Sequence, residues 1–137
     1  MNYELSRGLR NCNPLNIRHS ASKWQGMRKE QTDKAFVQFR HIAWGFRAAF
    51  CLLRTYLLKY HLDTPKKIIT RWAPPNENDT QSYLQLACTH SRLSEDYRFT
   101  SEVDPKLKDL VEAMARIECG VMPDLMALDC GWEMYLG

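Results

Sequence analysis

From residue 42 onward, apolar residues recur every three or four positions, a spacing that predicts helices. The longest such stretch runs from about residue 42 to residue 60, with apolar residues at positions 46, 49, 50, 53, 57 and 60. Positions with this spacing lie on one face of a helix. We therefore predict a long, largely buried central helix over residues 42 to 60.

Start and stop signals bound the next helix. Thr64 offers an N-cap oxygen, and Pro65 is already fixed in helical φ, so a helix is expected to begin here. It should run through two isoleucines to Trp72, where the prolines at positions 74 and 75 end it.

Three further helices are predicted. One begins at a capping residue between positions 78 and 80 and ends near Ser91. Its inward side chains are expected to be Tyr83, Leu84, Leu86 and Ala87. A second follows Asp104 and ends at Gly120, a natural residue for the position after a helix. Its apolar stripe comprises Leu107, Leu110, Val111, Met114 and Ile117. The last spans residues 123 to 136 and is expected to break or fray at Gly131.

Residues 35 to 39 (AFVQF) form the stretch that best suits a strand, and it could pair with residues 15 to 18. Residues 28 to 34, including Asp33, resemble a solvated loop. No internal repeat or flexible linker interrupts the chain. The expected fold is mainly α (α+β): one domain over residues 1 to 137 with a small β-hairpin near the N-terminus.

The composition fits one soluble domain. The chain has 137 residues, of which 45% are hydrophobic, enough for one substantial core. Its net charge of +3 is too weak an excess to imply nucleic-acid binding. No apolar run has the length of a signal peptide or a membrane span. We expect synthesis in the cytoplasm, followed by association with a virion or release by a separate export route.

The cysteines and histidines are scattered. Five cysteines include no CxxC pair, and none has a histidine at ligand spacing. We therefore expect free thiols, no metal site and no cofactor. Phosphate-loop, GxSxG, HExxH and dinucleotide-binding motifs are also absent from the sequence.

Asparagines gather in the segment RGLRNCNPLNIR, residues 7 to 18. An asparagine side chain carries a donor and an acceptor, which recognition of sugar hydroxyls and acetamido groups requires. Asn11, Asn13 and Asn16 are therefore candidates for substrate binding. The alternative is that these asparagines close turns against their own backbone.

A second cluster lies in RWAPPNENDT, residues 71 to 80. An aromatic face can stack on a sugar ring while amides and carboxylates orient its hydroxyls. The candidates for substrate binding are Trp72, Asn76, Asn78, Thr80 and Tyr83. Under the alternative interpretation, Trp72 belongs to the core, residues 78 to 80 cap a helix, and Glu77 is solvated.

Three glutamates are candidates for a catalytic acid, ranked Glu118, Glu77 and Glu4. Glu118 lies four residues beyond Met114 on the apolar stripe, at the negative end of the helix dipole. Such a position favours the protonated carboxyl group that a general acid needs. The alternatives are that Glu118 pairs with an arginine or caps exposed backbone amides, and that Glu4 is simply a solvated terminal charge.

Several segments together resemble a family of phage and prophage proteins from Bacteroides-type and other bacterial genomes. They are RGLRNCNPLNIR, SKWQGM, FVQF, WGFRAAFCLLRTY, IITRWAPPNENDT with Tyr83, and ARIECG. Members of that family are described as phage virion structural proteins or lysozyme-like virion proteins. Cys12 and Cys119 stand where the family pattern has asparagine.

The resemblance implies a lysozyme-like helical domain of phage origin, distantly similar to lytic transglycosylases. In such proteins the Asn-rich turn lines a glycan cleft, so the expected partner is peptidoglycan or another N-acetyl sugar polymer. The leading hypothesis is a muramidase or lytic transglycosylase. The alternatives are a non-catalytic virion structural or assembly protein and a carbohydrate-binding module.

Overall fold

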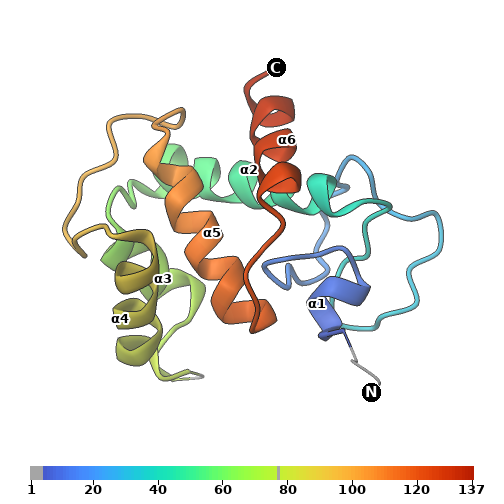
Figure 1. Cartoon of the computed structure of the whole chain (residues 1–137), viewed down its shortest axis with the longest axis horizontal. Coiled ribbons are helices and arrows are strands. Elements are labelled where there is room, and N and C mark those ends of the chain that lie inside the picture. Colours follow the sequence, from blue (N-terminus) through green and yellow to red (C-terminus); the bar gives the residue numbers. More distant parts are fainter. Residues whose placement is uncertain (1–4, 77) are drawn as a thin grey trace.

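The computed structural model describes residues 5 to 76 and 78 to 137. This part of the chain is mainly helical (Figure 1). Its helices are α1 (Arg7–Arg10), α2 (Ile42–Tyr60), α3 (Pro65–Trp72), α4 (Thr80–Ser91), α5 (Lys106–Cys119) and α6 (Leu125–Leu136). In Figure 1, α5 lies between the α3–α4 pair on one side and the N-terminal segment with α1 on the other. α5 therefore joins the two parts of the chain that carry the candidate site residues.

The predicted helix boundaries are largely confirmed. Thr64 caps α3 by accepting a hydrogen bond from the backbone N–H of Lys67 at 3.2 Å. Asp79 caps α4 in the same way, and Gly120 ends α5 with a φ of 74°. α1 was not predicted, and it adds a single turn capped by Ser6. These helix ends fix where the segments on either side of α5 begin.

The core lies where α2 packs against α6 and where α4 packs against α5. Phe50 of α2 meets Trp132 of α6 edge to face, with ring centroids 4.9 Å apart. Two residues predicted to point inward lie at the surface instead: Tyr60 is 39% exposed and Leu86 is 46% exposed. Leu86 belongs to α4 but is not on the face that buries Leu84 and Ala87.

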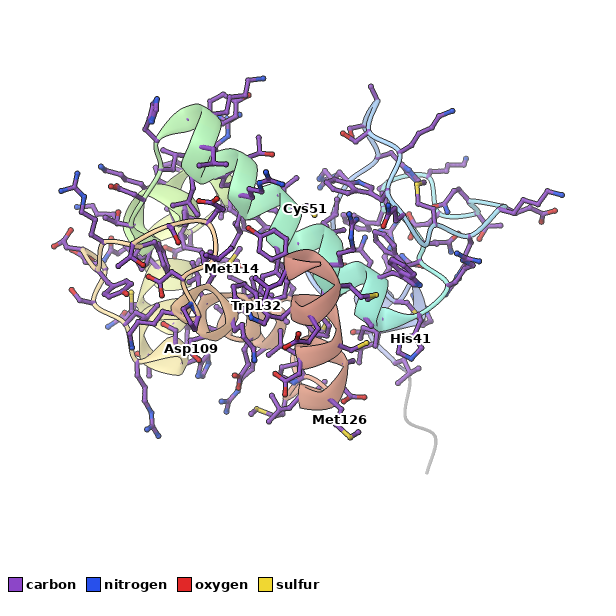
Figure 2. The ribbon with its side chains drawn as sticks, turned by 90° about the horizontal axis from the view of Figure 1, so that it is seen from above. His41, Cys51, Asp109, Met114, Met126 and Trp132 are labelled. Carbon is purple, nitrogen blue, oxygen red and sulfur yellow. The ribbon has the colours of Figure 1, made fainter. Side chains whose placement is uncertain are left out.

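α6 continues without a break through Gly131, so the predicted fraying there is wrong. A Cβ atom at this position would lie 2.7 Å from the Cβ of Phe46 and 2.8 Å from the carbonyl oxygen of Ala43. The glycine thus allows α6 to approach α2 closely. Figure 2 shows Met126, 84% exposed, at the N-terminal end of α6, whereas Trp132 further along the helix is buried.

The predicted β-hairpin is not present in the described residues. Two isolated antiparallel bridges take its place, Arg18 with Phe36 and Met27 with Phe39. Residues 15 to 18 and 35 to 39 do run side by side. Backbone hydrogen bonds join Val37 to Ile17 and His19 to Ala35, both at 3.0 Å, and a side chain satisfies further backbone groups. Asn13 Nδ2 donates to the carbonyl oxygens of Ile17 and Val37 at 3.0 and 2.8 Å. The Asn13 side chain thus supplements a backbone ladder that is too short to form a strand pair.

Asp33 is a centre of hydrogen bonding rather than part of a solvated loop. Its carboxylate accepts two hydrogen bonds from the Arg7 guanidinium, at 2.6 and 2.7 Å, and one from Asn11 Nδ2 at 2.9 Å. The Arg7 hydrogen bonds, followed by that from Asn11, hold the pKa of Asp33 well below its usual range. Asp33 therefore ties α1 to the segment that leads into α2.

Candidate functional site

A cavity of about 490 Å³ opens between the N-terminal segment, α2 and the α3–α4 pair. Five aromatic side chains contribute to its lining: Trp24, Phe36, Tyr56, Trp72 and Tyr83. The polar residues in the lining include Asn16, Arg18, His19, Asn78 and Glu118. An apolar aromatic wall with a few convergent polar groups is typical of a small-molecule or polymer binding site.

Glu118 is the meeting point of the site. Its Oε1 accepts a hydrogen bond from Asn16 Nδ2 at 3.0 Å. Its Oε2 accepts one from the Tyr83 hydroxyl at 2.9 Å and one from Trp72 Nε1 at 3.3 Å. The carboxyl group is partly buried and acts as an acceptor through both oxygens. The structure therefore brings one catalytic candidate together with three of the predicted binding residues.

The Tyr83 hydroxyl keeps its proton in this setting. Burial raises the pKa of Tyr83 far above its usual value, and the negative charge of Glu118 raises it further. A tyrosine that holds its proton next to a carboxylate serves as a hydrogen-bond donor. Tyr83 therefore holds Glu118 in place and donates to its carboxylate.

Local structure explains how these residues meet. Glu118 lies on α5 one residue before the end of the helix, next to the buried Cys119. α4 packs along α5, which turns Tyr83 toward the carboxylate. Asn16 has a φ of 52°, a left-handed conformation that asparagine tolerates better than most residues. Gly8 leaves room beside it, because a Cβ there would lie 2.9 Å from Asn16 Oδ1.

Asn11 and Asn13 lie outside the cavity lining, and both are buried. Asn11 donates to Asp33 and accepts from Gln38 Nε2 at 3.0 Å. Asn13 uses its amide to donate to two backbone carbonyls, and its Oδ1 accepts from the backbone N–H of Ile17 at 2.9 Å. Their side chains hold the turn in shape, as the alternative interpretation proposed, whereas Asn16 faces the cavity.

In the segment from Arg71 to Thr80, too, some candidates line the cavity and others do not. Trp72 and Asn78 line the cavity. Thr80 donates its hydroxyl to the carbonyl oxygen of Ala73 and so closes the turn between α3 and α4. Asn76 is exposed and is not in the lining. The candidates Glu77 and Glu4 lie outside the described residues.

The sequence did not identify several residues of the cavity wall. Trp24, Phe36 and Tyr56 come from a loop, from the bridged segment and from α2, and their aromatic character alone does not separate a cavity wall from a core. Two guanidinium groups also contact the Phe36 ring: the Cζ atom of Arg7 lies 4.5 Å from its centroid and that of Arg18 lies 5.1 Å from it. This stacking places the Arg18 cation beside the cavity wall.

The described residues hold no cluster of three or more histidine, cysteine, aspartate or glutamate side chains that could bind a metal ion. All five cysteines are free, and the buried Cys119 donates its thiol to the Pro14 carbonyl oxygen at 3.3 Å. Among the described helices, none is long and apolar enough to cross a membrane.

Comparison with known proteins places the chain among phage proteins. No family model matches it. Over 123 residues the chain is 36% identical to Protein P5 of Pseudoalteromonas phage PM2, a match that covers 88% of this chain and 75% of that protein. The predicted phage relationship is confirmed, although this relative comes from a Pseudoalteromonas phage and not from a Bacteroides-type genome. The chain belongs to the family of this phage protein.

Proposed function

We propose that this member of the Protein P5 family binds the glycan strands of peptidoglycan in the cavity around Glu118 and cleaves them there. One observation carries the proposal: a partly buried carboxyl group lies in an aromatic-lined cavity and meets an amide from the Asn-rich turn at 3.0 Å. Aromatic faces suit sugar rings, and the amide groups of Asn16 and Asn78 suit acetamido and hydroxyl groups.

In the proposed reaction, the acid form of Glu118 donates its proton to the glycosidic oxygen as the bond from that oxygen to the anomeric carbon breaks. The sugar becomes oxocarbenium-like. The resulting carboxylate then takes a proton from the hydroxyl group that attacks the anomeric carbon, which restores the acid. With water as the attacking group the enzyme is a muramidase, and with the C6 hydroxyl of the same sugar it is a lytic transglycosylase.

Tyr83 and Trp72 support these steps in different ways. A hydroxyl group can both donate and accept, so Tyr83 can accept from Glu118 when the carboxyl group is protonated and donate to it after proton transfer. The indole N–H of Trp72 can only donate, so it stabilises the carboxylate. The two side chains together keep the carboxyl group oriented through the reaction.

The lining of the described cavity contains a single carboxyl group, that of Glu118. Hydrolases of this type generally use two carboxylates, one on each side of the glycosidic bond. In the transglycosylase reaction, by contrast, the attacking group belongs to the substrate. Mass spectrometry of the released fragments distinguishes the two reactions, because the transglycosylase product is lighter by one water.

The test is the release of soluble fragments from purified peptidoglycan sacculi by the wild type and by Glu118→Gln. Glu112→Gln is the matched control, because it removes the same charge from the same helix outside the cavity. Loss of general acid catalysis should lower the rate by about 10²- to 10⁴-fold, with the control unchanged. Glu77→Gln and Glu4→Gln test the remaining ranked candidates. Equal rates for the wild type and all three Glu→Gln candidates would overturn the catalytic proposal.

A non-catalytic virion-associated protein is the second candidate. It is favoured by the three donors that already occupy both oxygens of Glu118, an arrangement that a purely structural carboxylate would also have. It is consistent with the phage relative. This candidate predicts that the wild type releases no fragments, and that Glu118→Gln changes thermal stability without changing the binding of sacculi. Detection of the chain in purified phage particles would establish its location.

A further inference from the structure

A second cavity, of about 580 Å³, adjoins the Glu118 cavity. The two share Ser22 and Trp24 in their linings, so Trp24 forms a common wall. We call the second one the cationic cavity, because three of the eight residues that line it are Lys23, Arg54 and Lys59. Its lining contains no aspartate or glutamate.

These three cations are available to a ligand. All three are exposed, and within the described residues none of them forms an ion pair. The exposed cation Arg98 differs, since it pairs with Asp63 at 2.9 Å. A cluster of unbalanced positive charge in a concave surface attracts anionic groups.

α2 connects the two cavities. Leu52 and Tyr56 of this helix line the Glu118 cavity, and Cys51, Arg54, Thr55 and Leu58 line the cationic cavity. The second set has the spacing of one helix face. Leu58 is 51% exposed, so the floor of the cationic cavity offers apolar contact beside its charges. One extended ligand could therefore follow α2 from one cavity to the other.

We propose that the polymer bound at Glu118 continues across Trp24 into the cationic cavity and places carboxylate groups against Lys23, Arg54 and Lys59. This inference rests on the proposed function. Peptidoglycan strands carry such carboxylates on the peptides attached to their sugars. The cationic cavity would select carboxylate-bearing glycans over neutral ones, while the Glu118 cavity holds the bond that is cleaved.

The test compares the double variant Arg54→Gln/Lys59→Gln with the wild type and with Lys29→Gln/Lys66→Gln. The control removes two exposed positive charges outside both cavities, so it matches the change in net charge. Binding is measured by co-sedimentation with sacculi whose carboxylates are intact and with sacculi whose carboxylates have been converted to amides. Thermal unfolding of each variant verifies that it is folded.

The cavity variant should bind intact sacculi about two- to thirtyfold more weakly than the wild type, since it removes two exposed charges that can each form an ion pair with a carboxylate. The loss should shrink on amidated sacculi and at high salt. If the wild type binds sacculi and the cavity and control variants bind them with equal affinity, the inference is overturned and the proposed function is left intact. No binding or cleavage of sacculi by the wild type would overturn both.

Discussion

Removing the Tyr83 hydroxyl should cost more stability when residue 118 is glutamate than when it is glutamine. The hydroxyl lies 2.9 Å from Glu118 Oε2, and both side chains are partly buried. A hydrogen bond to a charged group contributes about 1.5 to 3 kcal/mol, whereas one between neutral groups contributes about 0.5 to 1.5 kcal/mol. Tyr83→Phe should therefore cost about 2 kcal/mol in the wild type and about 1 kcal/mol in Glu118→Gln, a coupling energy of about 1 kcal/mol.

The assay is urea unfolding of the wild type, the two single variants and the double variant. Tyr97→Phe is the control, because its hydroxyl donates to Asp104 at 2.8 Å in a separate network. Its cost should be the same in both backgrounds. A coupling between Tyr83 and Glu118 no larger than about 0.3 kcal/mol, the usual error of additivity, would refute the interpretation that a charged carboxylate is held by this hydroxyl.

The other predictions concern packing, pH and the two kinds of asparagine. Gly131→Ala should destabilise the protein by about 1 to 3 kcal/mol in urea unfolding, because the added methyl group meets the α2 backbone. Helix propensity alone predicts a gain in stability instead, and such a gain would contradict the packing argument. Cys130→Ala is the control. The lowered pKa of Asp33 means that its ionised form stabilises the fold above the usual carboxyl pKa of 3.8, and that this contribution is lost as the pH falls below that value. Asp33→Asn should therefore lower the melting temperature at pH 7 and flatten its decline in acid, as followed by circular dichroism. Asn13→Ala should lower the free energy of unfolding by about 1 to 3 kcal/mol or more, since one unsatisfied buried group already costs that much. Asn16→Ala should mainly lower fragment release. The opposite pattern would contradict a structural role for Asn13 and a binding role for Asn16.

Much of the helical framework could be predicted because its signals are local. Thr64 and Asp79 are capping residues whose partners lie three positions away, and Gly120 ends α5 through its own φ. The break predicted at Gly131 is wrong because glycine weakens an isolated helix, whereas here it allows α6 to approach the surface of α2 closely. That surface is distant in the sequence.

In the candidate site, too, local features could be predicted and contacts between distant residues could not. Glu118 could be selected as a candidate from the sequence, since a carboxyl group on an apolar helical stripe is unusual whatever its partners are, and its catalytic role stays a prediction. The three asparagines could not be separated, because an amide that binds its own backbone and an amide that faces a cavity have the same sequence pattern. The role of Asp33 was missed because its strongest partner, Arg7, is 26 residues away. The small hairpin was predicted from the β-forming residues of 35 to 39, but the side chain of Asn13 supplies contacts that a neighbouring strand would otherwise make.

The three residues that donate to Glu118 are Asn16, Trp72 and Tyr83, which precede it in the chain by 102, 46 and 35 residues. No local segment can hold the carboxyl group by itself, so the site exists only while the N-terminal turn, α3, α4 and α5 are assembled together. Heat or denaturant should abolish the catalytic arrangement in the same transition that unfolds the domain. Conversely, a ligand that bridges these elements binds only the assembled state, and it should raise the unfolding temperature further with each tenfold increase in ligand concentration above its Kd.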